Sequence, residues 1–113
     1  MSDRVWSRLE VEAATADYLE MLVLELNGEP FSKAARWRAL QPLLNDRTKG
    51  SIERKHQNIS AVLIDVGLPY VDGYKPLRNY QTLLQEVVTD VVASRPDVLA
   101  TIRARVDEPP QAP

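Results

Sequence analysis

The sequence predicts an all-α domain of four or five helices around a single core. Apolar side chains recur at three- and four-residue spacing in several segments, which is the period of one helix face. Capping residues and chain breakers bound these segments, as expected at helix ends. The chain has 113 residues, 44% of them hydrophobic, enough for one modest core. We expect a helical domain over residues 1–106. Residues 107–113 contain three prolines and are expected to form a disordered tail or the start of an interdomain linker.

The first helix has the clearest boundaries. Ser7 and Glu10 have the spacing of a capping box, in which each side chain accepts a hydrogen bond from the other residue's backbone. The helix is predicted to run to about Leu26 and to stop at Asn27 and Gly28, a favourable pair at a helix C-terminus.

The second helix is predicted over residues 33–44, with Ser32 as its N-cap. Pro42 lies late in this helix and must kink or shorten it, because proline lacks the amide hydrogen that the helix needs. Residues 45–50 are polar and form a turn.

The third helix is predicted over residues 52–66, capped by Ser51 and closed by Gly67. On a helical wheel one narrow arc is apolar apart from a histidine; it contains Ile52, His56, Ile59, Leu63 and Val66. Four residues are predicted to point the other way: Arg54, Gln57, Asn58 and Ala61. Ser51 is expected on the outward side of the first turns, with Lys55 on its flank.

An ordered loop over residues 68–78 is expected to separate the third and fourth helices. Asn79 is the predicted N-cap of the fourth helix, which extends to about Ser94. The high β-branched content makes a strand over residues 86–92 the main alternative. Helix is favoured because apolar pairs repeat every four residues. A short fifth helix is predicted from Asp97 to about Val106.

Charge is distributed unevenly along the chain. The whole chain carries a net charge of −2, but residues 33–57 contain seven basic and two acidic residues, a net charge of +5. A basic segment in an acidic domain can form a phosphate-facing patch. The alternative is a solvated helical face with no ligand.

The second and third helices and their turn form a predicted helix–turn–helix-like pair. In DNA-binding proteins the second helix of such a pair enters the major groove, although a purely structural helix pair remains the alternative. Phosphate contacts are expected from the turn, and arginine, glutamine and asparagine side chains could reach base edges. The candidate DNA-binding residues at positions 47–58 are Arg47, Thr48, Lys49, Ser51, Arg54, Lys55, Gln57 and Asn58. Lys75 and Arg78, in the loop with Tyr70 and Tyr74, are candidates for a second contact with the DNA phosphate backbone. The alternative is that the two tyrosines have only a structural role and hold the loop against the domain.

Other chemistry has little support in the sequence. His56 shares the apolar arc and is interpreted as a packed core residue, and Trp6 and Trp37 as core residues. Asp46, Glu53 and Lys55 imitate a metal-nuclease pattern, but Glu53 and Lys55 point in opposite directions on a helix. No catalytic residue, metal or cofactor is predicted for the domain, since the sequence has no cysteine and one histidine. A cytoplasmic location is expected, because the N-terminus lacks a signal-peptide layout.

Residues 47–63 also carry a family resemblance. They read Arg-Thr-Lys-Gly-Ser-Ile-Glu-Arg-Lys-His-Gln-Asn-Ile-Ser-Ala-Val-Leu. This resembles a pattern, Arg-Ser/Thr-x-Gly/Ala-Ser-Ile/Val-x-x-Lys-x-x-Asn-Ile-Ser-x-Val-Leu, in N-terminal modules of bacterial HNH endonucleases related to modification-dependent type IV restriction enzymes. The matching positions are Arg47, Ser51, Lys55 and Asn58. Residues 67–76 and 79–81 are also similar to that family, and the resemblance covers roughly residues 5–93.

The resemblance implies a DNA-associated accessory domain of a multidomain restriction or phage-defence nuclease. No HNH signature is present in the sequence, so nuclease activity is not implied for this domain. The resemblance and the basic segment together predict that the domain binds double-stranded DNA, modified or unmodified, on behalf of an attached effector domain. The alternative is a protein-interaction or self-association module that uses the third helix or the loop with Tyr70 and Tyr74 and binds no nucleic acid.

Overall fold

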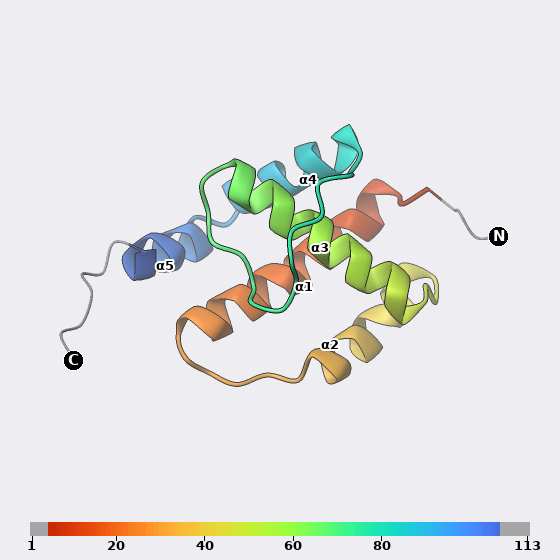
Figure 1. Cartoon of the computed structure of the whole chain (residues 1–113), viewed down its shortest axis with the longest axis horizontal. Helices are drawn as coiled ribbons and strands as arrows, with labels where there is room; N and C mark the ends of the chain where they lie inside the picture. The colour runs from red at the N-terminus through yellow and green to blue at the C-terminus, as the bar shows by residue number, and fades with distance from the viewer. Residues whose placement is uncertain (1–4, 107–113) are drawn as a thin grey trace.

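The computed structural model describes residues 5–106 and confirms an all-helical domain (Figure 1). In this range the chain forms five α-helices and one 3-10 helix, and it contains no strand. They are α1 (Arg8–Leu26), α2 (Lys33–Leu40), the 3-10 helix η1 (Gln41–Leu44), α3 (Lys49–Asp65), α4 (Thr82–Ala93) and α5 (Pro96–Val106). The predicted tail at residues 107–113 lies outside the described residues.

Helix α1 contacts every other helix of the described chain. It packs against α3, α4 and α5, while α4 also packs against α3 and α5. Its N-terminus has the predicted capping box, with Glu10 N donating to Ser7 Oγ and Ser7 N donating to the Glu10 carboxylate. The predicted end at Leu26 is also confirmed, and Gly28 has a φ of 72°, a left-handed conformation that favours glycine.

Helix α2 ends earlier than the prediction of a helix over residues 33–44 and continues as η1. Pro42 occupies the first turn of η1, where the missing amide hydrogen breaks no helical bond. Asn45 and Asp46 then both adopt positive φ angles, a conformation that asparagine and aspartate tolerate better than most residues. Because α2 packs against α1 rather than closely against α3, the predicted helix–turn–helix-like pair is not confirmed.

Two predicted N-caps are wrong. Helix α3 begins at Lys49 rather than at position 52, because the Thr48 hydroxyl, not Ser51, accepts the capping hydrogen bond, which Ser51 N donates. Helix α4 begins at Thr82 after Gln81, and no side chain caps it. Asn79 cannot cap α4 because residues 79–81 still belong to the preceding loop. The strand alternative for residues 86–92 is excluded by α4.

The long connection between α3 and α4, residues 67–81, crosses back over α3 and is called the strap here (Figure 1). Val71 N donates to the Tyr18 hydroxyl at 2.8 Å, which attaches the strap to α1. Further along, Leu77 N donates to the backbone oxygen of Gln57 in α3. The strap therefore covers part of α3 that a helical wheel assigns to solvent.

Candidate nucleic-acid interface

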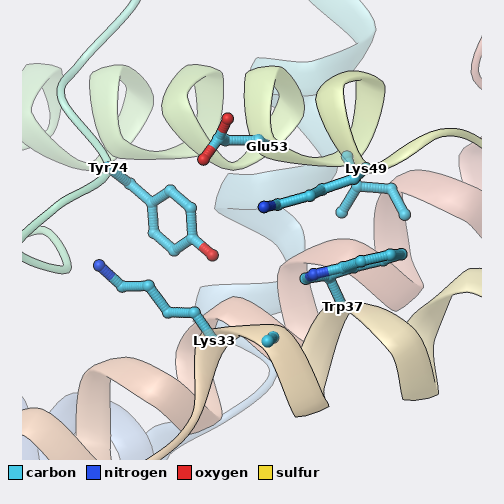
Figure 2. Close-up of a pocket in the computed structure, with 7 residues that line it drawn as sticks. Lys33, Trp37, Lys49, Glu53 and Tyr74 are labelled. Atoms are coloured by element: carbon cyan, nitrogen blue, oxygen red, sulfur yellow. The ribbon is translucent and has the colours of Figure 1, made fainter.

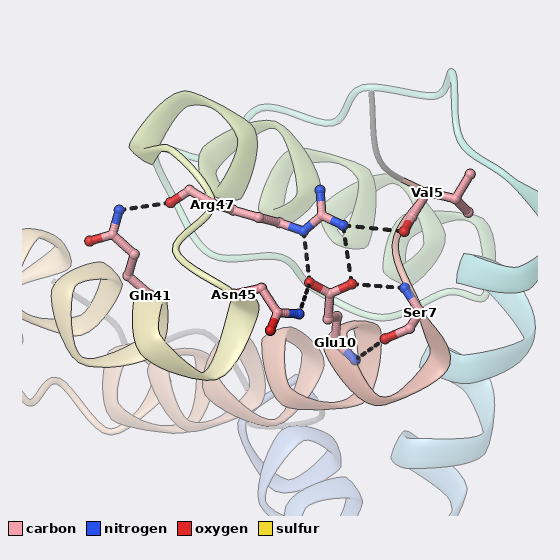
Figure 3. A network of polar contacts seen from close by, with 6 residues as sticks. All are labelled: Val5, Ser7, Glu10, Gln41, Asn45 and Arg47. Carbon is pink, nitrogen blue, oxygen red and sulfur yellow. Dashed lines mark hydrogen bonds and ion pairs between the residues drawn. The ribbon is translucent and has the colours of Figure 1, made fainter. Parts of the chain in front are cut away.

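Arg47 lies on the turn before α3, where it was predicted to contact phosphate. Its side chain is instead buried, with 7% of its surface exposed. Figure 3 shows its guanidinium group paired with the Glu10 carboxylate at the start of α1. Two hydrogen bonds join them, from Nε to Oε2 at 2.9 Å and from Nη2 to Oε1 at 3.1 Å. Nη2 also donates to the backbone oxygen of Val5. The expectation of an exposed Arg47 is therefore wrong: the side chain joins the turn to α1.

Glu10 receives hydrogen bonds from several directions. Besides Arg47, the Asn45 side chain and the backbone N–H of Ser7 donate to its carboxylate. The hydrogen bond from Arg47, followed by those from Ser7 and Asn45, lowers the pKa of Glu10 to about 2, against the opposing effect of burial. The carboxylate is thus ionised at neutral pH.

This pKa predicts an acid-sensitive contribution to stability. Because the Glu10 pKa falls from 4.5 to about 2 on folding, its contribution is fully present above about pH 4.5 and lost as the pH falls toward 2. The measurement is urea unfolding of the native protein and Glu10→Gln between neutral pH and pH 2. The difference in unfolding free energy between the two proteins should shrink through this window. A difference that stays constant with pH would contradict the assignment.

A second basic residue of the segment also pairs with α1. Arg36 in α2 donates to Asp17 at 2.9 Å and to Glu20 at 3.0 Å. Part of the positive charge of residues 33–57 is therefore neutralised inside the domain by carboxylates of α1. The surface patch is smaller than the sequence count indicates.

Two residues predicted on the outward face of α3 are buried under the strap. Asn58 is 4% exposed, and its Nδ2 donates to the backbone oxygen of Leu77 at 2.6 Å. Ala61 is fully buried. Their predicted outward orientation is wrong because the strap covers this side of α3. Gln57 is half-buried beside the same segment.

The predicted basic and polar residues that remain at the surface come from two elements. Lys49 and Arg54 of α3, and Lys75 and Arg78 of the strap, are exposed. Lys75 lies between Tyr74, whose ring stacks on His56 of α3, and Leu77, which bonds to Gln57. It therefore lies beside α3. Arg78 contacts Asp65 at the end of α3.

The remaining candidates have local structural roles. Thr48 caps α3, and Ser51 N donates to that cap. The Lys55 ammonium lies over the Trp6 ring, 5.0 Å from its centroid, and Arg47 lies over the same ring at 4.3 Å. Burial, together with the nearby charge of Arg47, lowers the pKa of Lys55. The interpretation of Trp6 as a core residue agrees with its burial.

His56 is buried in the core, as its position on the apolar arc predicts, with 1% of its surface exposed. Its Nδ1 lies 2.9 Å from the backbone oxygen of Ile52, and its Nε2 lies 3.4 Å from Asp17 Oδ2. The ring packs against both Tyr18 and Tyr74, with centroid distances of 5.7 and 5.0 Å, and the two tyrosine rings lie 6.2 Å apart. Tyr74 is thus a packed residue of the strap, whereas Tyr70 is exposed.

Figure 2 shows a pocket that opens between α2 and α3. Its volume is about 290 Å³, and its lining residues are Lys33, Ala34, Trp37, Lys49, Ile52, Glu53 and Tyr74. Lys33 Nζ donates to the Asp72 backbone oxygen and lies over the Tyr74 ring. Gly73 permits this arrangement, since a Cβ there would collide with Lys33 Nζ. Sequence reasoning missed the pocket, because its residues come from three separate segments.

The described chain gives no sign of a metal centre or a membrane span. Over residues 5–106, no three histidine, aspartate or glutamate side chains are grouped to hold a metal ion. None of the helices there combines the length and the apolar character that a membrane crossing requires. Comparisons with protein-family models, curated proteins and solved structures found no match to this chain.

Proposed function

We propose that the domain binds double-stranded DNA, modified or unmodified, mainly through phosphate groups. The main support is that Lys49 and Arg54 of α3 and Lys75 and Arg78 of the strap are exposed basic residues. Lys49, Arg54 and Lys75 form no ion pair with any residue in the described part of the chain. Their charges are therefore available to a ligand. Neutralising phosphates with such groups releases bound counterions, which drives association.

The position of these groups favours phosphates over bases. Lys49 occupies the first turn of α3, where the helix dipole also attracts anions. Asn58 is engaged with the strap and Arg47 with Glu10, so neither contributes to the proposed contact. Arg54 and the half-buried Gln57 are the remaining candidates for limited contact with base edges.

The acidic residues of α4 indicate which side of the domain faces the DNA. Helix α4 has an exposed Glu86 and contains no lysine or arginine, and its exposed Asp90 is paired with Arg8 of α1. Phosphates are repelled there, so we place the duplex on the side of α3 and the strap.

We also infer that the domain acts for an attached effector. The support is the resemblance of residues 47–63 to modules of HNH endonucleases, together with the proline-containing segment at residues 107–113. In this proposal the attached domain cuts DNA, and the helical domain has no nuclease activity of its own.

Charge-removing variants test the proposed interface. Lys49→Ala and Arg54→Ala should each weaken binding to every duplex and reduce the slope of log affinity against log salt by about one unit. Fluorescence anisotropy of a labelled duplex over a salt series provides the measurement. Arg103→Ala is the matched control, because Arg103 is an exposed arginine on α5 and its loss should leave the slope unchanged.

Equal slopes for all three variants would contradict the proposal. Absence of duplex binding at low salt, accompanied by concentration-dependent self-association in analytical ultracentrifugation, would favour the interaction-module alternative.

A further inference from the structure

The pocket between α2 and α3 contains two polar groups with no hydrogen-bond partner in the described chain. Tyr74 is 6% exposed, yet its hydroxyl makes no hydrogen bond with any residue of the 5–106 range. The indole Nε1 of Trp37 is buried and also lacks a partner there. Burial without a hydrogen-bond partner is unfavourable for the Trp37 nitrogen, and the Tyr74 hydroxyl is directed into the pocket. Such groups therefore point to a ligand that supplies the missing acceptors.

Both groups are hydrogen-bond donors at neutral pH. An indole nitrogen can only donate. Burial raises the pKa of Tyr74 to about 12, and the charges of Asp17 and Glu53 act in the same direction. The phenol therefore keeps its proton and can donate it to an acceptor.

A positive charge lies next to these donors. Figure 2 shows the Lys49 ammonium, the Tyr74 hydroxyl and the Trp37 indole nitrogen all pointing toward the middle of the pocket. The Lys49 side chain forms no ion pair or hydrogen bond among residues 5–106. Lys33, at the far edge, is already held by Asp72 and by the Tyr74 ring.

We propose that this pocket binds a phosphate monoester group through Lys49, Tyr74 and Trp37. Three donors reach it from α3, the strap and α2, an arrangement that suits the several acceptor oxygens of a tetrahedral oxyanion better than a planar carboxylate. Charge-assisted hydrogen bonds of this kind are short and strong. The pocket shares Lys49 with the proposed DNA surface, whereas Arg54 and Lys75 do not line it.

Glu53 decides which phosphate compounds the pocket favours. Its carboxylate also lines the pocket and repels an anion, but it can accept a hydrogen bond from a neighbouring hydroxyl. A ligand that joins a phosphate to a hydroxyl-bearing sugar therefore fits better than inorganic phosphate. We expect a nucleoside monophosphate to bind more tightly than inorganic phosphate, and Glu53→Gln to reduce this preference.

The two tryptophans allow a direct test by NMR. The chain contains only Trp6 and Trp37, so the indole N–H region holds two signals, which single Trp→Phe variants assign. Titration with adenosine monophosphate should shift the Trp37 signal to saturation and leave the Trp6 signal in place. Inorganic phosphate should move the same signal at higher concentration. No saturable shift of the Trp37 signal by either compound would overturn the proposal.

Paired variants keep the test specific. Tyr74→Phe removes one hydroxyl while keeping the packed ring, and should weaken adenosine monophosphate binding about tenfold, the loss of one hydrogen bond to a charged group. Tyr70→Phe removes a hydroxyl from an exposed tyrosine of the same strap and should have no effect. Equal affinities for the two variants would contradict the assignment.

Duplexes with and without 5′-phosphates distinguish the source of the phosphate. If the pocket takes a DNA end, Tyr74→Phe weakens binding of the phosphorylated duplex alone. If it takes a free nucleotide, neither duplex is affected, while adenosine monophosphate binding still falls. Arg54→Ala provides the complementary control, because it should weaken both duplexes without changing nucleotide binding. Loss of nucleotide binding in Tyr74→Phe therefore tests the pocket, and loss of duplex binding in Arg54→Ala tests the proposed DNA surface separately.

Discussion

Replacing Arg47 with alanine should lower the free energy of unfolding by about 3–5 kcal/mol, the cost of leaving one member of a buried ion pair without its partner. The Glu10 carboxylate would lose two hydrogen bonds and its compensating charge. A small domain has a total stability of about 5–15 kcal/mol, so this loss is a large fraction of the total. Urea denaturation followed by circular dichroism measures the change.

Two comparisons separate this effect from a general loss of charge. Arg54→Ala removes an exposed arginine and should change stability by less than about 0.5 kcal/mol. The double variant Glu10→Leu/Arg47→Met removes both charges and should be more stable than Arg47→Ala, since apolar residues can replace a buried ion pair. An Arg47→Ala protein as stable as the native one would contradict the structural role.

His56→Ala should cost about 3 kcal/mol, the order expected when a large buried side chain is truncated. The change removes the ring that packs against Tyr18 and Tyr74 and the hydrogen bond between Nδ1 and the Ile52 backbone oxygen. It also leaves a cavity where α1, α3 and the strap meet. Thermal and urea unfolding measure the loss.

The neighbouring residue supplies the control for His56. Gln57 is half-buried on the same helix, and its backbone oxygen accepts a hydrogen bond from Leu77 N of the strap. Because alanine keeps this backbone oxygen, Gln57→Ala should cost much less. An unchanged melting temperature for His56→Ala, together with lost DNA or nucleotide binding, would instead make His56 a ligand-contacting residue.

The features predicted correctly from sequence depend on local signals. The capping box at Ser7 and Glu10, the break at Gly28 and the shortening at Pro42 each involve residues within one or two turns. The apolar arc likewise placed His56 in the core. Such signals are strong because helix periodicity and capping are properties of neighbouring residues.

The wrong predictions depend on partners far away in the sequence. Arg47 is buried because it meets Glu10, 37 residues earlier, and Asn58 is buried because the strap folds back over α3. A helical wheel gives the direction of a side chain but not what covers it. The shift of the α3 N-cap from Ser51 to Thr48 is a different error, since both residues are good caps and lie three positions apart.

The candidate site was predictable in part. Lys49, Arg54, Lys75 and Arg78 are exposed, as a basic surface requires, but Arg36 and Arg47 are paired with carboxylates of α1. No sequence pattern connects the pocket donors Trp37 and Tyr74, because their side chains come together only when α2, α3 and the strap pack against one another.

The proposed DNA surface is tested most directly by following backbone amide signals while a short duplex is added at low salt. We expect the shifts to concentrate on residues 48–57 and 75–78, to weaken with added salt, and to spare α4 with its acidic Glu86 and Asp90. Shifts confined to α1 and α4 would contradict DNA binding by α3 and the strap. So would the absence of shifts at millimolar duplex, since non-specific binders reach dissociation constants of about 10⁻⁴ M or tighter.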